Sequence, residues 1–380
     1  MQLIPGHAEA QASQAYAGQQ GAACGEGHYS EFLRTGIQLS SIGAGTFPGE
    51  ASAAQDARLG QLLIQAVRQG INVIDTASHY RYGHSLVAVG AAVRALVAEG
   101  LPRQALFLVS KGGFLTLRGG KPTDFDAWFR REIVDRGLGQ AQDLAGEAHL
   151  LSPAYIDYQL DLSRRLMGVE TLDAFLVDQP EVHIPVIGKE RLNQKLLPVF
   201  ALLERAVREG RIRNYGIATF NGFRVETDHP LFESLASLQG LAEKAAREVA
   251  GEGAEHHFKL IQMPFNAVMN EGFTRFNQAT GQGNIAATLQ AAYQLGLYVM
   301  GSHGMMKGHL ARQGLEVLRQ AMPELANDAQ RALQCNRSTP GLGTTLVGLR
   351  SPQHLDDALA VCRRPVMPKK AYLALYQRAQ

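Results

Sequence analysis

The chain has 380 residues, of which 46% are hydrophobic and 19% are charged, so it is long enough to bury a large core. Its formal net charge is only +2, which argues against nucleic-acid and membrane-surface proteins. The chain has three scattered cysteines, no apolar run of the ~20 residues that span a bilayer, and no secretory-signal pattern. These features predict a cytoplasmic α/β protein.

The first 27 residues are rich in Ala, Gln and Gly and poor in large apolar side chains. Such a segment buries too little surface to offset the entropy that ordering it removes. We therefore expect residues 1–27 to form a mobile or loosely packed tail. The compact domain is expected to be single and to occupy residues 28–380, because no linker divides that part of the chain.

From residue 28 onward, short apolar or β-branched runs alternate with longer amphipathic stretches. Eight runs have the length of an ordinary strand: Leu39–Phe47, Ile71–Asp75, Leu106–Lys111, Asp173–Asp178, Asn214–Thr219, Lys259–Gln262, Leu297–Ser302 and Thr344–Val347. Helical spacing of apolar residues marks Ala54–Gln69, Leu86–Ala98, Ser152–Met167, Arg191–Glu209, Asn284–Leu295 and Pro352–Cys362. About eight strand–helix units predict parallel pairing in one closed (β/α)8 TIM barrel. A doubly wound open sheet is the alternative architecture.

Two segments are longer than ordinary loops. Gly112–Leu151 follows the third predicted strand, and Phe223–Glu255 follows the fifth. Long loops in a compact domain are usually functional, and in a barrel the binding sites form at the carboxyl ends of the strands. We therefore expect both segments to be long loops at that face.

Familiar single motifs are mostly absent. The run from Gly43 to Gly49 has one residue too many between its second and third glycines for a dinucleotide fingerprint. His256 and His257 are adjacent, so they do not share one helix face, and no Cys or carboxylate stands near them at ligand spacing. No metal site is predicted.

Polar residues do gather at the predicted strand ends. Asp75, Lys111 and Asp178 close the second, third and fourth strands, and Tyr80 lies in the loop above Asp75. In a barrel these ends converge on one pocket. A buried Lys beside Tyr80 lowers the pKa of the phenol, and a carboxylate keeps that Lys charged, which predicts a general acid. The alternatives are a structural ion pair between Lys111 and Asp75 and a rim aromatic at Tyr80.

The segment Asp75-Thr-Ala-Ser-His-Tyr-Arg-Tyr-Gly-His-Ser85 resembles the signature of the aldo-keto reductase superfamily, Asp-Thr-Ala-x-x-Tyr-x-x-Gly-x-Ser. Further blocks are similar to family blocks and stand in the same order: Leu33–Phe47, Phe107–Lys111, Leu166–Pro180, Arg208–Thr219, Ile261–Asn266 and Val347–Leu355. The resemblance covers about residues 30–365, and this ordered series is more specific than any single block. The insertion that ends at Pro153 suggests a subgroup with an enlarged third loop.

The resemblance implies a barrel that binds NADP(H) and a small-molecule substrate at its mouth. It implies that Tyr80 is the proton donor and that Lys111 and Asp75 tune its pKa. The implied cofactor-binding positions are Thr46, Thr219, Gln262, Ser302, Met305, Gly308, Gly348, Arg350 and Gln353. The guanidinium of Arg350 suits a 2′-phosphate, which favours NADP over NAD.

The chain departs from the family pattern at several positions. Asp178 stands where the family has a His that donates a hydrogen bond to the substrate oxygen. An ionised Asp does not donate, but a protonated one does, and burial near Asp75 raises the pKa of Asp178. Gly301 replaces a stacking aromatic residue and Ala358 an amide that contacts adenine. His79 and His303 are candidates for the missing proton chemistry, or else rim histidines.

Two classes of function therefore stay open. The first is an NADPH-dependent oxidoreductase that acts on a ketone, aldehyde or enone, which the retention of Asp75, Tyr80 and Lys111 favours. The second is a non-redox descendant of the fold, which the loss of the family His favours. It would be an isomerase or lyase that uses the carboxylates at the barrel mouth, or a cofactor-binding regulatory protein. The oligomeric state stays open as well.

Overall fold

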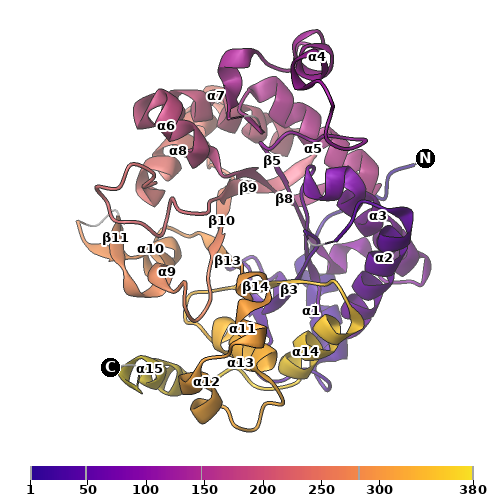
Figure 1. Ribbon diagram of the computed structural model, residues 1–380, viewed down its shortest axis with the longest axis vertical. Helices are drawn as coiled ribbons and strands as arrows, with labels where there is room; N and C mark the ends of the chain where they lie inside the picture. The colour runs from indigo at the N-terminus through magenta and orange to yellow at the C-terminus, as the bar shows by residue number, and fades with distance from the viewer. Residues whose placement is uncertain (1, 48, 147, 281–282, 379–380) are drawn as a thin grey trace.

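The computed structural model describes residues 2–47, 49–146, 148–280 and 283–378. Its centre is a closed barrel of eight strands, each paired in parallel with both neighbours (Figure 1). In chain order the barrel strands are β3 (Ile42–Gly45), β4 (Val73–Asp75), β5 (Phe107–Gly112), β8 (Leu172–Asp178), β9 (Ile212–Ala218), β10 (Phe258–Pro264), β13 (Tyr298–Ser302) and β14 (Thr344–Gly348). The predicted (β/α)8 barrel and its eight strands are confirmed, and the open-sheet alternative is wrong.

Helices surround the barrel and connect its successive strands, as parallel pairing requires (Figure 1). The main ones are α2 (Ala53–Arg68), α3 (His84–Ala98), α5 (Pro153–Met167), α7 (Lys189–Arg208), α8 (Leu235–Ala250), α10 (Thr288–Gln294), α13 (Asp328–Arg337) and α14 (Pro352–Cys362). The shorter helices α6 (Ile184–Ile187), α9 (Glu271–Thr274), α11 (His309–Arg312) and α12 (Glu316–Ala321) lie within the connections. Helix α15 (Lys369–Arg378) follows α14.

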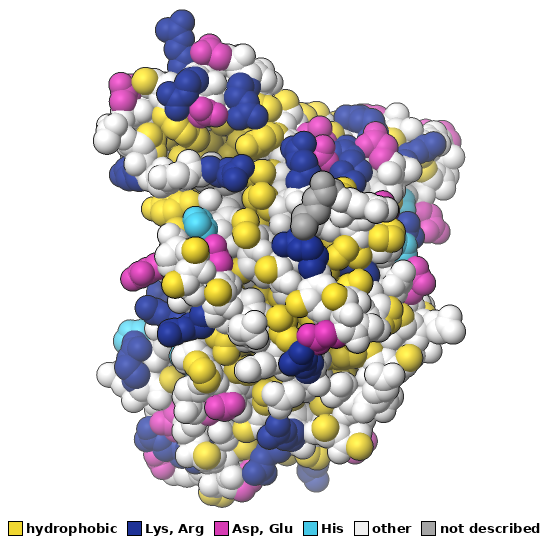
Figure 2. Space-filling model, turned by 90° about the vertical axis from the view of Figure 1, so that its right-hand side faces the viewer, with side chains coloured by type: hydrophobic (Ala, Val, Ile, Leu, Met, Phe, Trp, Pro, Cys, Tyr) yellow, Lys and Arg dark blue, Asp and Glu magenta, His cyan; other side chains and the backbone are white. Residues whose placement is uncertain are grey.

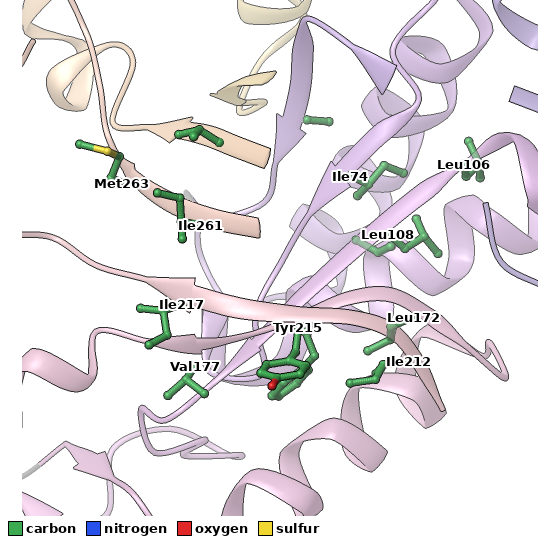
Figure 3. Packing of buried hydrophobic residues seen from close by; sticks show 14 of the residues in the cluster. Ile74, Leu106, Leu108, Leu172, Val177, Ile212, Tyr215, Ile217, Ile261 and Met263 are labelled. Atoms are coloured by element: carbon green, nitrogen blue, oxygen red, sulfur yellow. The ribbon is translucent and has the colours of Figure 1, made fainter. Parts of the chain in front are cut away.

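Side chains of the barrel strands alternate between two buried layers, because successive residues of a strand point to opposite faces. Val73 and Leu176 belong to the cluster that fills the barrel, together with Phe32 from the N-terminal hairpin. Ile74 and Val177, their neighbours in the chain, belong to the layer between the strands and the helices (Figure 3). The interior is thus a packed core, and polar groups are left for its open end.

A hairpin of β1 (Tyr29–Glu31) and β2 (Gln38–Ser40) precedes the barrel, and the described residues before it include a helix. Helix α1 (Ala10–Gln20) buries the ring of Tyr16, whose hydroxyl donates to the carbonyl of Val67. This finding corrects the prediction of a loosely packed tail over residues 1–27. The prediction failed because α1 buries few side chains and carries no apolar stripe, so its sequence has no amphipathic pattern.

The segment Phe223–Glu255 is not the long loop that we predicted. It contains α8, the helical connection between β9 and β10. Its apolar residues Leu235, Leu238, Leu241, Ala245 and Val249 recur at helical spacing, so the sequence does carry the pattern of this helix.

The segment Gly112–Leu151 is a true insertion at the carboxyl end of β5. It holds α4 (Phe125–Phe129), one π-helical turn, and a short hairpin of β6 (Leu144–Ala145) and β7 (His149–Leu150). Leu115, Phe129, Ile133 and Leu150 of the insertion form an apolar cluster with Tyr155 of α5. The insertion is therefore a small packed lobe on the site face of the barrel.

The surface carries Lys and Arg interspersed with Asp and Glu, as the face in Figure 2 shows. Among the described residues, no helix combines the length and the apolar character needed to cross a membrane. The same residues contain no cluster of three or more His, Cys, Asp or Glu that suits a metal ion.

Candidate active site

The predicted catalytic residues meet at the carboxyl ends of three adjacent strands. Asp75 is the last residue of β4, Lys111 stands one before the end of β5, and Asp178 is the last residue of β8. The strands β4, β5 and β8 are neighbours in the barrel, so these ends lie side by side. Tyr80 opens a 3-10 turn, η1 (Tyr80–Gly83), just beyond β4.

Lys111 and Asp75 form a buried ion pair, as their places at the strand ends suggested. The ammonium of Lys111 donates to both carboxylate oxygens of Asp75 at 2.7 Å and to the carbonyl of Thr76 at 2.9 Å. The side chains of Lys111 and Asp75 are only 1% and 5% exposed. Gln262 donates to the same carboxylate at 2.9 Å. All three ammonium protons are therefore in use, and the cation is fixed in position.

Tyr80 is half-buried, and its ring centroid lies 4.9 Å from the ammonium of Lys111. Burial raises the pKa of Tyr80 well above its ordinary value, and the carboxylates of Asp75 and Asp178 raise it further. The prediction that Lys111 lowers this pKa is therefore wrong. The reason is that Lys111 is neutralised by Asp75, so the pair offers the phenolate no net positive charge.

The turn that carries Tyr80 is held in an uncommon backbone conformation. Arg81 and Tyr82, which follow it, have φ angles of 51° and 58°, in the left-handed region. The buried guanidinium of Arg81 donates to the carboxylate of Asp56 in α2 and, at 2.8 Å, to the carbonyl of Glu50. These contacts hold a conformation that is unfavourable for side chains with a Cβ, and so they fix the position of Tyr80.

Asp178 is buried, and its carboxylate faces the ring of His79. The distance from Nε2 of His79 to Oδ2 of Asp178 is 3.7 Å. Burial raises the pKa of Asp178 to about 7; Lys111 opposes this rise, and Asp75 and Glu181 add to it. Burial also lowers the pKa of His79 to about 3, helped by the charge of Lys111. His79 is therefore neutral at neutral pH, and burial favours the protonated form of Asp178 far more than in an ordinary aspartate.

The insertion supplies a histidine that we did not predict as part of the site. Nε2 of His149, in β7, donates to the main-chain carbonyl of Asp178 at 2.6 Å. Its Nδ1 must then accept, and it lies 2.9 Å from Nε2 of His183. Burial lowers the pKa of both rings, to about 3 for His149 and about 4 for His183, so both are neutral. His149 thereby positions the end of β8.

A glycine makes room for this contact. A Cβ placed on Gly113, where φ is +130°, would lie 2.4 Å from Nε2 of His149 and 3.1 Å from the carbonyl oxygen of Asp178. Only glycine fits this conformation and this close approach. The segment Ala148-His-Leu-Leu-Ser-Pro153 marks the insertion in the sequence, but nothing in it reveals that His149 reaches β8.

Three of the predicted cofactor positions lie at the barrel mouth beside these groups. The Thr46 hydroxyl donates to the carbonyl of Asp75 at 3.0 Å, and Gln262 contacts the Asp75 carboxylate. Thr219 stands one residue beyond the end of β9, and its main-chain N–H donates to the carbonyl of Gln262 at 2.9 Å. The buried Thr219 hydroxyl has no hydrogen-bond partner among the described residues. The structure brings Thr46, Thr219 and Gln262 together with Asp75.

The other predicted cofactor positions lie at the carboxyl ends of β13 and β14 and in the segments that follow them. Ser302, at the end of β13, and Met305, in the loop that follows, are half-buried; that loop has left-handed backbone at His303, Met306, Lys307 and Gly308. Gly348, Arg350 and Gln353 are exposed around the start of α14. β13 pairs with β14, so these loops are adjacent.

Two other residues of this region, His303 and Asp357, contact neighbouring side chains. The residue His303 is exposed, and its ring lies 5.1 Å, centroid to centroid, from that of Phe220. Asp357, in α14, accepts from Asn327 at 2.8 Å and from Gln330 at 3.0 Å. Asp357 therefore holds α13 against α14, and of the two histidines that we considered, His79 is the one beside Asp178.

A separate cleft of about 600 Å³ lies under the insertion lobe, which is at the top of Figures 1 and 2. It is lined by residues of η1, α3, α5 and the lobe, and none of the predicted site residues lines it. Gln159 stands between the cleft and the barrel mouth, since its amide donates to Ser78 at 2.9 Å and to Thr116 at 3.1 Å. The cleft is thus distinct from the candidate active site.

A parallel barrel whose mouth holds a buried Lys–Asp pair, a Tyr and a carboxylate of raised pKa defines a TIM-barrel enzyme. Comparisons with known proteins narrow this class. The model of the Aldo/keto reductase family matches residues 41–228. A curated relative, the NADH-specific methylglyoxal reductase of Escherichia coli strain K12, is 27% identical over 200 residues. The match covers 51% of each, so the chain aligns with about half the length of this relative.

Solved structures share the fold along most of the chain. An aldo/keto reductase from Klebsiella pneumoniae in complex with NADP and acetate is 19% identical, with a TM-score of 0.58, and covers 92% of this chain and 95% of its own. An aldo-keto reductase from Bacillus halodurans in its holo form is 15% identical, with a TM-score of 0.58 and coverages of 92% and 95%. The family model and the curated relative support the aldo-keto reductase superfamily, as the signature segment suggested.

Proposed function

We propose that this protein is an NADP(H)-dependent oxidoreductase that reduces a carbonyl or an enone of a small organic molecule, with Tyr80 as the proton donor. The observation that carries the proposal is the position of the Tyr80 ring 4.9 Å from the ammonium of Lys111, which Asp75 holds at the barrel mouth. A half-buried phenol beside a fixed ion pair is arranged for proton transfer to a bound substrate.

The residues at the mouth fit a nicotinamide cofactor. The buried Thr219 hydroxyl lacks a partner among the described residues, as expected for a group that contacts a ligand. Thr46, Thr219 and Gln262 would hold the nicotinamide end, Ser302, Met305 and Gly308 the pyrophosphate, and Gly348, Arg350 and Gln353 the adenosine phosphate. When bound, the cofactor supplies a hydride to the substrate carbon.

The raised pKa of Tyr80 favours reduction over alcohol oxidation. In reduction, the phenol gives its proton to the substrate oxygen, which becomes an alkoxide as its carbon gains hydride. An alkoxide is a stronger base than a phenolate, so a phenol of raised pKa still transfers its proton. Oxidation of an alcohol needs the phenolate as base, and burial beside Asp75 and Asp178 disfavours the phenolate.

Asp178 serves as a hydrogen-bond donor in its protonated form. Because burial raises its pKa to about 7, a large fraction of the protein carries the neutral acid near neutral pH. The neutral acid donates to the substrate oxygen, whereas the carboxylate would repel the developing negative charge. Asp178 therefore fills the role of the family His over a limited pH range.

The first substrate to try is methylglyoxal, because the relative from Escherichia coli is named for its reduction. That relative is also named as NADH-specific, whereas the exposed guanidinium of Arg350 suits the 2′-phosphate of NADPH. The cofactor preference is therefore measured directly, by fluorescence or calorimetric titration of the protein with NADPH and with NADH.

The proposal would be supported by micromolar binding of NADPH and weaker binding of NADH. It would also be supported by consumption of NADPH in the presence of methylglyoxal or another carbonyl or enone. Lack of binding of either cofactor at millimolar concentration would overturn it. That outcome would favour a non-redox reaction at Tyr80, Lys111 and Asp178.

A further inference from the structure

His79 occupies a position that the family signature leaves free for any residue, and here it faces the one catalytic position that departs from the family. Its ring lies against Tyr80 at a centroid distance of 4.8 Å and against Phe114 at 5.1 Å. Its Nε2 lies 3.7 Å from Oδ2 of Asp178. The side chain is 18% exposed at the mouth of the barrel.

We propose that Nε2–H of His79 donates a hydrogen bond to the substrate oxygen, so that His79 and Asp178 together replace the single histidine of the family. This inference rests on the proposed function and adds a catalytic residue to it. The 3.7 Å between Nε2 and Oδ2 is too long for a direct hydrogen bond. An oxygen atom placed at the edge of this gap accepts from both groups, while Tyr80 approaches it from the neighbouring turn.

The tautomer of His79 follows from its surroundings. Nδ1 is buried and has no partner among the described residues. If the proton were on Nδ1, a buried N–H would be left unpaired, whereas a proton on Nε2 leaves only an acceptor unpaired there. Orphaned N–H groups are the rarer of the two in proteins. The proton therefore sits on Nε2, the nitrogen that faces Asp178.

The charges around His79 keep it a neutral donor. The ammonium of Lys111 in β5 and the ring of His149 in β7 both disfavour a second proton on His79, and burial disfavours it most. Asp178, by contrast, titrates with a pKa of about 7 under the influence of Lys111, Asp75 and Glu181. Below that pH the substrate oxygen meets two donors. Above it, Asp178 is a carboxylate that draws Nε2–H away from the substrate.

A double-mutant cycle tests the proposal, with NADPH and methylglyoxal as the probes. H79F keeps an aromatic ring against Tyr80 and Phe114 but removes the donor. We expect kcat to fall by about 10²-fold, as for loss of one oxyanion donor, with the Kd of NADPH unchanged. H79Q, which retains an N–H, should recover part of this loss.

D178H restores a donor at the end of β8, so in that background H79F should lower kcat by less than about threefold. An H79F variant that keeps the wild-type kcat, or an equal loss in both backgrounds, would overturn the role of His79. H229L is the matched control, because His229 is exposed and its ring makes a local contact with the main-chain N–H of Leu231. It should leave kcat unchanged.

A second readout does not depend on turnover. NMR of protein labelled with ¹³C in its histidine rings follows His79, whose signal is the one missing from H79F. We expect that signal to move with a midpoint near pH 7, as Asp178 titrates, and to lose this inflection in D178N. If the pH dependence of the His79 signal is the same in D178N as in the wild type, the inference is overturned. If the wild type does not bind NADPH or does not turn over a substrate, the proposed function is overturned instead. The NMR result would still decide whether His79 senses the titration of Asp178.

Discussion

Lys111 directs all three protons of its ammonium group at Asp75 and the adjacent Thr76 carbonyl, inside a barrel that excludes water from both charges. Breaking a buried pair by removing one partner leaves the other charge uncompensated. The pair therefore matters to the stability of the barrel as well as to the chemistry at its mouth.

K111M should destabilise the protein by ~3–5 kcal/mol, because Asp75 is left buried without its cation. Urea unfolding measures the difference. K111M/D75N, in which no unpaired charge remains, should lose less than K111M alone. K121M is the control, since Lys121 is exposed, and it should unfold like the wild type. Equal stability of K111M and K121M would contradict the argument.

Y80F should lower kcat by ~10²–10⁴-fold while leaving the fold and the binding of NADPH intact, because only the transferable proton is removed. Steady-state kinetics with a carbonyl substrate, together with a cofactor titration, checks both parts. The matched control is Y82F, since Tyr82 lies two residues further on and its side chain is 41% exposed. Normal turnover by Y80F would remove Tyr80 as the proton donor.

Carbonyl reduction should decline as the pH rises through about 7. The pKa of Asp178 is raised to about 7 in the folded protein, so its proton, and with it the donated hydrogen bond, is present below that pH and lost above it. A pH profile of kcat from 5 to 9 measures the effect. In D178N, whose amide donates at every pH, kcat should no longer decline as the pH rises through 7. A wild-type profile that is flat across pH 7 would speak against a protonated Asp178.

R350A should weaken the binding of NADPH by about 10–100-fold, which is the loss of a charged hydrogen bond of ~1.5–3 kcal/mol. NADH lacks the 2′-phosphate and should bind R350A as it binds the wild type. Parallel titrations with both cofactors make the comparison. R363A, which alters an exposed guanidinium that contacts Gln69, serves as the control. Equal losses for the two cofactors would reject the 2′-phosphate role.

G113A should be more damaging than G119A, although both residues have a positive φ. A Cβ at Gly113 meets His149 at 2.4 Å, whereas a Cβ at Gly119 meets nothing within 4 Å. Backbone strain costs each variant ~1–2 kcal/mol, and only G113A adds a clash of ~1–3 kcal/mol. Thermal unfolding measures the first effect. A fall in kcat confined to G113A would show that His149 positions Asp178, and identical behaviour of the two variants would refute this.

The barrel could be predicted because its signals are local. Each strand is a short run of apolar residues, and the Asp75–Ser85 signature places Tyr80 five residues beyond a strand end, so the pairing of Lys111 with Asp75 follows from the parallel topology. Helix α1 was missed because its sequence lacks amphipathic spacing, whereas α8 was missed although its apolar residues recur at helical spacing.

The contacts that depend on tertiary structure could not be predicted. His149 reaches Asp178 only because the insertion folds back against residues 113–115, just beyond β5, and no periodic pattern in the sequence encodes that path. The raised pKa of Tyr80 was missed for a similar reason. The direction of the pKa shift of Tyr80 depends on how completely Asp75 neutralises Lys111 and on how deeply the phenol is buried. Neither can be predicted from the spacing of residues in the sequence.

The contacts of residues 4–8, which precede α1, affect the order in which parts of the chain fold. The main chain of Ala8 bonds to Asp173, a residue 165 positions further along the chain, and Ile4 pairs with Val169. During synthesis these partners emerge long after residues 4–8. Ile4 and Ala8 therefore cannot make these contacts until the first four barrel strands have been synthesised, and their docking belongs to the late steps of folding.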